Sequence, residues 1–155
     1  MSTNPDFAAV QESWQERETA RKRLAEKIFP LNKAVLFSAL RDARITELTV
    51  GYDGSGDEGR IDNIVACAGS EIVDVPGIIV DLSYADETGG GAKSRRTDLN
   101  GAIGDFAEEL IYRLYPWWED NDGAYGEVTF DVAAETVTLD HNARFTAVNS
   151  FQHDF

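Results

Sequence analysis

Hydrophobic residues in the first third of the chain recur at the spacing of α-helices. Asn4 is suited to cap a helix and Pro5 to occupy its first turn. Apolar side chains then follow at helical spacing as far as Ile28, although Arg17 and Arg21 interrupt the middle of this stripe. Pro30 should end this helix, because a proline pushes the residue before it out of the helical region, and should open a second helix. The pattern therefore predicts two helices before residue 44.

After residue 44 the hydrophobic period changes to alternation, which is typical of strands with one buried face. A first hairpin is predicted over residues 45–68, where ITELTVGY and RIDNIVACA flank a glycine-rich loop. EIVDV and GIIVDLSY predict a second pair of strands, joined by a turn at Pro76–Gly77. The polar stretch 85–96, ADETGGGAKSRR, is expected to be a mobile loop.

Two further elements complete the predicted fold. An apolar stripe from Thr97 to Leu114 predicts one more helix, which Pro116 stops, and residues 125–141 predict a third hairpin. Because strands on short turns pair antiparallel, we predict an α+β fold with the order ααββββαββ, in which helices cover one face of a mainly antiparallel sheet of about six strands. We divide the chain into an N-terminal helical segment, residues 1–44, and an α+β domain, residues 45–155.

The charge of the chain is strongly negative and unevenly distributed. The net charge is −14; residues 1–44 carry eight basic and six acidic side chains, whereas residues 45–155 carry six basic and twenty-two acidic ones. A body of this charge should repel nucleic-acid backbones and attract cations or basic protein surfaces. Solubility alone is the alternative explanation for the acidity.

The rest of the sequence argues against a membrane-spanning or secreted protein and against sites built from several cysteines. No apolar run approaches the ~20 residues of a membrane span, and the N-terminal stretch lacks the basic start and apolar core of a secretory signal. The single cysteine, Cys67, excludes an internal disulfide and a cysteine-rich zinc site. We expect a cytoplasmic protein that makes no membrane contact.

The loop YDGSGDEGRID, residues 52–62, is the first candidate site. It fails the EF-hand pattern, because Glu58 stands where that pattern needs a glycine. A cation site built from Asp53, Asp57, Glu58 and Asp62 stays open as an interpretation. The alternative is a plain hairpin turn, in which glycines supply the backbone conformations and the acids keep the turn hydrated.

The segment PWWEDNDGAYGE, residues 116–127, is the second candidate site. Trp117 and Trp118 stand beside Asp120 and Asp122, and a large apolar anchor with a polar rim is the composition of a binding hot spot. The alternative is that both indoles cap the core. If the two candidate loops lie at one edge of the sheet, they would form a single negative patch of Asp53, Asp57, Glu58, Asp120, Asp122 and Glu127.

Motifs for catalysis are sparse. In TGGGAKSRR, Ala92 stands where a Walker A motif has a glycine, so nucleotide binding is not expected. The sequence contains neither the GxSxG nucleophile elbow nor the HExxH zinc motif. Asp140 and His141 are a candidate acid–base pair, although adjacency in sequence does not bring side chains together. We expect a non-enzymatic protein without a cofactor.

Three stretches carry a resemblance to a known family: TVGYDGSGDEGRID, then NGAIGDFAEELIYRLYPWWEDNDGAYGEVTFDVAAETVTLDHNARF, then a tail that ends in HDF. Over about residues 45–155 the chain resembles a family of small bacterial proteins of unknown function, whose members are often found on plasmids, prophages and other mobile elements. The resemblance implies a bacterial origin and a role in conflict between element and host. It implies no catalytic residue and no cofactor.

Together these features favour an acidic binding protein that engages a basic or nucleic-acid-binding protein. In one form of this hypothesis its carboxylates mimic the phosphates of a nucleic acid, while the protein itself binds none. The alternative is a protein that binds Ca²⁺ or Mg²⁺, or hydrolyses a substrate with a metal, through the loop carboxylates. A third candidate is protein contact through the basic N-terminal helices. The partner-binding residues that we predict are Asp53, Asp57, Glu58, Asp62, Trp117, Trp118, Asp120 and Asp122.

Overall fold

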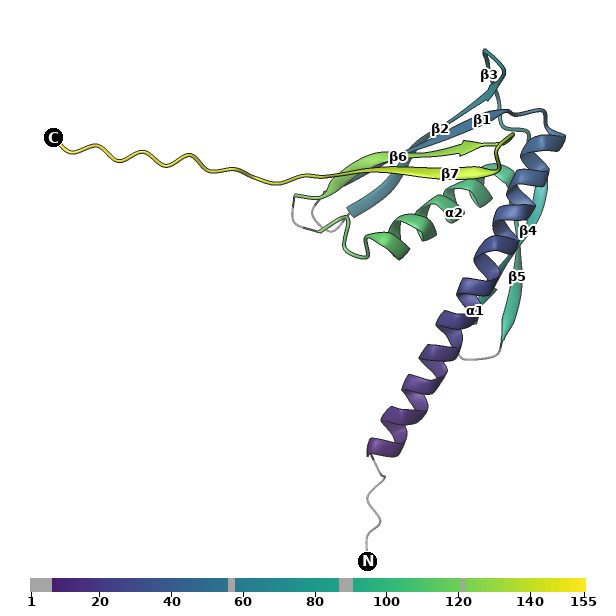
Figure 1. Ribbon diagram of the computed structural model, residues 1–155, viewed down its shortest axis with the longest axis horizontal. Coiled ribbons are helices and arrows are strands. Elements are labelled where there is room, and N and C mark those ends of the chain that lie inside the picture. Colours follow the sequence, from purple (N-terminus) through teal and green to yellow (C-terminus); the bar gives the residue numbers. More distant parts are fainter. Residues whose placement is uncertain (1–6, 56–57, 87–90, 121) are drawn as a thin grey trace, which may run out of the picture.

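The computed structural model describes residues 7–55, 58–86, 91–120 and 122–155, and it has the expected α+β fold (Figure 1). The described residues form two helices and seven strands in the order αβββββαββ. The elements are α1 (Phe7–Asp42), β1 (Glu47–Ser55), β2 (Glu58–Ala68), β3 (Glu71–Val73), β4 (Ile79–Ala85), β5 (Ala92–Asp98), α2 (Leu99–Leu114), β6 (Ala124–Asp131) and β7 (Thr136–Ala143).

Five of the strands form one antiparallel sheet with the spatial order β3-β2-β1-β6-β7. Alternate residues of β1 are buried, among them Leu48, Val50 and Tyr52, and β6 alternates in the same way. The hydrophobic alternation thus predicted these two strands and their inward face correctly. The inner face of the sheet lies against α2, whereas the polar outer face is left open (Figure 1).

Both helices pack on the inner face of the sheet. The carboxylate of Asp98 caps α2 by accepting a hydrogen bond from the backbone N–H of Gly101 at 2.8 Å. Phe106 of α2 and Phe37 of α1 both contact the ring of Phe130 on β6, with ring centroids 5.8 and 6.0 Å apart. These aromatic contacts join the two helices and the sheet into one core.

The expectation that Pro30 divides the N-terminal region into two helices is wrong, because α1 is continuous through this residue. A proline inside a helix costs about 3 kcal/mol, since it removes a hydrogen bond and crowds the preceding turn. Tertiary contacts hold the helix on both sides of it. Phe29 stacks on Phe106 at 4.7 Å, and the buried Asn32 amide exchanges two hydrogen bonds of 2.8 Å with the backbone of Ser83.

The expected pairing of the middle strands is also wrong. The short β3 pairs with β2, while β4 pairs with β5 in a separate hairpin beside α1. The strand β5 takes residues 92–96 of the stretch 85–96 that we expected to be a mobile loop, and residues 87–90 of that stretch lie outside the described part of the chain. Its residues are almost all exposed, so no hydrophobic alternation marked it. Cross-strand charge supports it instead, because Arg96 lies opposite Asp81 with an N–O distance of 3.7 Å.

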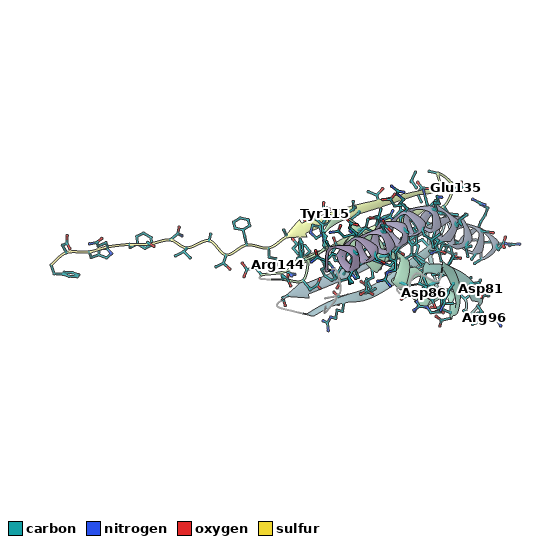
Figure 2. The ribbon with its side chains drawn as sticks, turned by 90° about the horizontal axis from the view of Figure 1, so that it is seen from below. Asp81, Asp86, Arg96, Tyr115, Glu135 and Arg144 are labelled. Atoms are coloured by element: carbon teal, nitrogen blue, oxygen red, sulfur yellow. The ribbon has the colours of Figure 1, made fainter. Side chains whose placement is uncertain are left out.

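Two segments extend away from the core. The first half of α1 projects beyond the sheet (Figure 1). The side chain of Trp14 in this half is exposed. Residues 144–155 leave β7 as an extended and exposed tail (Figures 1 and 2). The division at residue 44 stays a prediction, although Leu36 and Leu40 on one side of it share a core with Leu48 on the other.

Candidate functional site

The two candidate loops lie side by side at one end of the sheet. A side chain at Gly59 of β2 would collide with the ring of Trp118, which follows α2. Gly123 packs so closely against the backbone of Gly54 in β1 that a Cβ atom there would overlap its carbonyl group. Gly123 also has a φ of +78°, a conformation that glycine adopts without strain. The edge that we expected the loops to share is therefore present in the structure.

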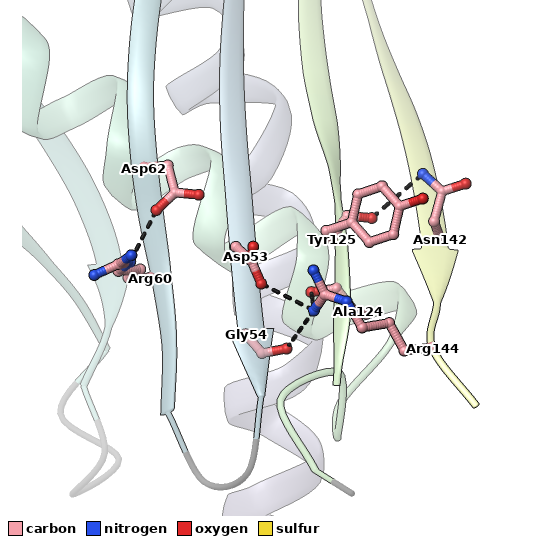
Figure 3. A network of polar contacts seen from close by, with 8 residues as sticks. All are labelled: Asp53, Gly54, Arg60, Asp62, Ala124, Tyr125, Asn142 and Arg144. Carbon is pink, nitrogen blue, oxygen red and sulfur yellow. Dashed lines mark hydrogen bonds and ion pairs between the residues drawn. The ribbon is translucent and has the colours of Figure 1, made fainter. Parts of the chain in front are cut away.

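Arg144, at the start of the tail, ties this end of the sheet together (Figure 3). Its Nη1 donates to the Asp53 carboxylate at 2.9 Å, to the Gly54 carbonyl at 3.1 Å and to the Ala124 carbonyl at 3.4 Å. The guanidinium also lies 4.7 Å from the ring centroid of Tyr125. The hydrogen bond to Asp53 raises the pKa of Arg144 above its ordinary value. Asp53 is thus neutralised within the chain.

The other predicted acids differ in their surroundings. Asp62 pairs with Arg60 at 2.8 Å (Figure 3), and Asp122 accepts a hydrogen bond of 2.7 Å from Thr146 of the tail. The half-buried side chain of Asp120 has no hydrogen-bond or ion-pair partner among the described residues. Asp57 and the side chain of Glu58 lie outside the part of the chain that the structure describes.

The two tryptophans have different roles. Trp118 is only 4% exposed and lies edge-on to Tyr52 and Tyr112, with ring centroids 5.3 and 6.0 Å apart. It caps the core, which is the alternative that we gave for both indoles. Trp117 is 76% exposed, so it is available as an anchor for a partner.

The outer face of the sheet carries a set of acids that lie directly opposite one another. In the strand register Glu47 of β1 faces Asp131 of β6, and Glu127 of β6 faces Asp140 of β7. All four side chains are exposed, and no described basic side chain lies within ion-pair distance of any of them. Our loop-centred predictions named only Glu127 among them. The sequence did contain a sign of this set, because acidic residues occupy outward positions of the alternating strands.

On the inner face, a stacked group of rings fills the same end of the sheet. The His141 ring stacks on Tyr115, with centroids 3.7 Å apart, and its Nδ1 lies 2.6 Å from the Tyr52 hydroxyl. Burial lowers the pKa of His141 and raises that of Tyr52. Gly126 of the intervening strand leaves room for this contact, because a Cβ there would collide with the Tyr52 hydroxyl.

This arrangement separates the candidate acid–base pair. Strand alternation places the exposed Asp140 side chain on the outer face of β7, whereas His141 lies on the inner face. The two side chains therefore do not act together. Within the described residues, no group of three or more histidine, cysteine, aspartate or glutamate side chains is arranged to hold a metal ion.

Comparison with known proteins then places the chain in a family. A family model matches residues 28–155, which is most of the chain. The chain belongs to a family of unknown function, DUF6878. The DUF6878 match begins at Ile28, in the part of α1 where the side chains become buried, and continues through the exposed tail. It includes the stretch 45–155 in which we found the resemblance.

The wider comparisons add no further relative of this DUF6878 chain. No curated protein and no solved structure matches it. In the described residues, neither helix contains a stretch that is long and apolar enough to cross a membrane.

Proposed function

We propose that this protein is a non-enzymatic binding protein that engages a basic protein partner through the outer face of its sheet. The observation that carries the proposal is the pair of directly opposed acids, Glu47 with Asp131 and Glu127 with Asp140. Like charges in this position destabilise a sheet. A partner that presents lysine or arginine side chains would relieve the repulsion, so the arrangement favours binding of a basic surface.

The loops at the end of the sheet extend this surface. Trp117 offers an exposed aromatic anchor, and Asp120 and Asp122 lie within a few residues of it. Asp53 and Asp62 are already paired with Arg144 and Arg60. A basic side chain of the partner would have to displace these arginines to pair with either carboxylate. We therefore assign the larger share of the attraction to the acids of the outer face.

The more specific form of the proposal is mimicry of a nucleic acid, in a protein that acts in conflict between mobile elements and their host. Glu127 and Asp131 stand four residues apart on the outer face of β6, which is about 13 Å along the strand, and each has an opposed acid on a neighbouring strand about 4.8 Å away, so the outer face presents negative charges in two spaced pairs. A basic partner that normally binds phosphates would gain from such a surface. In this form of the proposal, duplex DNA or RNA competes with the protein for its partner.

The test measures the affinity for a fluorescently labelled oligolysine peptide by polarisation at low salt. The double variant Glu127→Gln/Asp140→Asn removes two charges from the outer face, and Glu12→Gln/Glu16→Gln removes two exposed charges from α1. We expect the first variant to weaken binding about fivefold or more and the second less than about twofold. Near-ultraviolet circular dichroism of each variant checks that the fold is intact. Equal losses in the two variants would contradict the proposal, because they would reflect net charge alone.

A further inference from the structure

A groove lies on the inner side of the same end of the sheet, between the end of α2 and the edge strand β7. Its volume is about 390 Å³, which is within the range of small-ligand sites. Most of its lining comes from the segment that follows α2, and the rest from the last residue of α2, the first residue of β6, the end of β7 and the start of the tail. Figure 2 shows Tyr115 and Arg144, two of its lining residues, near the base of the tail. The other aromatic lining residues are Trp117, Trp118 and His141.

The charges around this groove are unequal. Arg144 lines it, but its guanidinium is engaged by the Asp53 carboxylate, by two backbone carbonyls and by the ring of Tyr125. Asp120 also lines the groove, and its carboxylate has no partner among the described residues. The His141 ring is held between Tyr115 and the Tyr52 hydroxyl, and burial lowers its pKa, so it is neutral at pH 7. The uncompensated charge of the groove is therefore negative.

Aromatic walls beside a single carboxylate favour one class of occupant. The faces of tryptophan and tyrosine rings attract cations, and tryptophan attracts them most strongly. An anionic group would be repelled by Asp120, and an apolar group would leave that carboxylate without a partner. A lysine or arginine side chain satisfies both features, because its stem packs on the rings and its charge is balanced by the carboxylate.

We propose that this groove binds the cationic side chain of a lysine or arginine residue, with Trp117 and Tyr115 as aromatic walls and Asp120 as the counter-charge. The inference rests on the proposed function, since it supplies a specific pocket for one residue of the basic partner. The groove lies on the other side of the edge strand β7 from the outer face, so the partner would have two contact sites, one on each side of this strand. Trp117 is then the anchor of the site, and the buried Trp118 also lines the groove.

The test follows the three indole N–H signals of Trp14, Trp117 and Trp118 by nuclear magnetic resonance during titration with small probes. The probes are N-acetyl-lysine amide, N-acetyl-arginine amide and the uncharged N-acetyl-norleucine amide. We expect the Trp117 signal to shift with the lysine or the arginine probe and not with the norleucine probe. The stronger of the two cationic probes identifies the preferred residue. The exposed Trp14 serves as an internal control, and its signal should not move.

Variants assign the roles of the groove residues. Trp117→Leu and Asp120→Asn should each weaken binding of the cationic probe by about threefold or more, as expected for a cation–π or charge contact at a partly exposed site. Glu12→Gln removes one exposed negative charge from α1, away from the groove, and should leave the affinity unchanged. An equal shift with the norleucine probe, an unmoved Trp117 signal, or full affinity in Asp120→Asn would overturn the proposal.

The two proposals fail separately. If the small probes do not bind the groove while Glu127→Gln/Asp140→Asn still selectively weakens oligolysine binding, the groove assignment is wrong and the outer face remains the binding surface. If the groove binds the cationic probes while the oligolysine affinity depends only on net charge, the proposed function of the outer face is wrong.

Discussion

Glu127 on β6 and Asp140 on β7 are direct partners in the antiparallel register, and both side chains are exposed on the outer face of the sheet. Two carboxylates in this position repel one another, and opposite charges there would attract. A sequence selected for stability alone would place a basic residue at one of the two positions. We therefore interpret the pair as a feature of binding that the fold retains at a cost in stability.

Reversing one of these charges should stabilise the protein and weaken its binding. We expect Glu127→Lys to raise the free energy of unfolding by about 0.5–1 kcal/mol, because it replaces a cross-strand repulsion with an ion pair. Urea denaturation followed by circular dichroism measures the change. Glu71→Lys on β3 is the control: it makes the same charge change opposite Ala68, where no acid faces it. A larger gain in the control would refute our reading of the register.

The contacts of Arg144 make a second prediction. Arg144→Ala removes three hydrogen bonds that join β1, β6 and the tail, and it leaves the Asp53 carboxylate without its cation. We expect the melting temperature to fall by about 2–4 °C. Arg60 pairs with Asp62 and is more exposed than Arg144. Arg60→Ala should therefore leave the melting temperature nearly unchanged. Similar melting temperatures for the two variants would show that Arg144 does not join these segments.

We expect the substitution of glycine by alanine to have opposite effects on stability at Gly126 and at Gly104. At Gly126 a Cβ would collide with the Asp140 carbonyl and with the Tyr52 hydroxyl, so Gly126→Ala should cost about 2 kcal/mol or more. At Gly104, inside α2, a Cβ meets no atom within 4 Å. Gly104→Ala should therefore stabilise the protein by about 0.5–1 kcal/mol through helix propensity. Chemical denaturation of both variants checks the pair, and a well-tolerated alanine at residue 126 would contradict the close approach of Tyr52 to His141.

How far the sequence predicted this fold depended on where the deciding interactions lie. Alternation within β1 and the apolar stripe of α2 are local, so both elements were predicted close to their observed bounds. Pro30 misled the analysis because the contacts that keep α1 continuous, from Phe29 to Phe106 and from Asn32 to Ser83, join residues far apart in the chain. The strand β5 was missed because charge pairing with β4 stabilises it, without an apolar face.

The candidate site was predictable to a similar degree. Acids and aromatic residues singled out the two loops, and the structure brings these loops together at one end of the sheet. The neutralisation of Asp53 by Arg144 could not be foreseen, since ninety-one positions separate the two residues. The opposed acids of β6 and β7 required the strand register, which the sequence pattern does not fix without the turn geometry.

The partly buried His141 predicts a pH dependence of stability. Burial lowers the pKa of His141 in the folded state, so the unfolded chain binds a proton at this residue more readily than the folded chain does. Stability from this source is complete above the unfolded value of about 6.5 and falls as the pH drops from there toward the lower folded value. Tyr52 and Tyr115 contact the ring, and Asp120 and Arg144 line the same groove.

Histidine variants isolate this contribution. The difference in unfolding free energy between pH 7.5 and pH 5.5 should shrink in His141→Gln and persist in His153→Gln, which alters the exposed tail. Denaturant titrations at the two pH values measure it. If the unaltered protein and His141→Gln lose the same unfolding free energy between pH 7.5 and pH 5.5, the pKa of His141 is not lowered in the folded state.

Divalent cations provide a test of the alternative function. Two carboxylates of the candidate cation site, Asp53 and Asp62, already pair with Arg144 and Arg60, so we expect millimolar Ca²⁺, Mg²⁺ or Mn²⁺ to leave the melting temperature unchanged. Differential scanning fluorimetry with and without each ion measures this. A rise that saturates with concentration and is lost in Asp53→Asn/Asp62→Asn would favour the cation-binding function over partner binding.

The most direct measurement of the central claim is a map of backbone amide shifts during titration with oligolysine at low and high salt. Our account predicts that the largest shifts lie at the outward-facing residues of β1, β6 and β7, around Glu47, Glu127, Asp131 and Asp140, and that they vanish as salt screens the charges. Shifts that are spread evenly over all acidic residues, or that gather on α1, would contradict it.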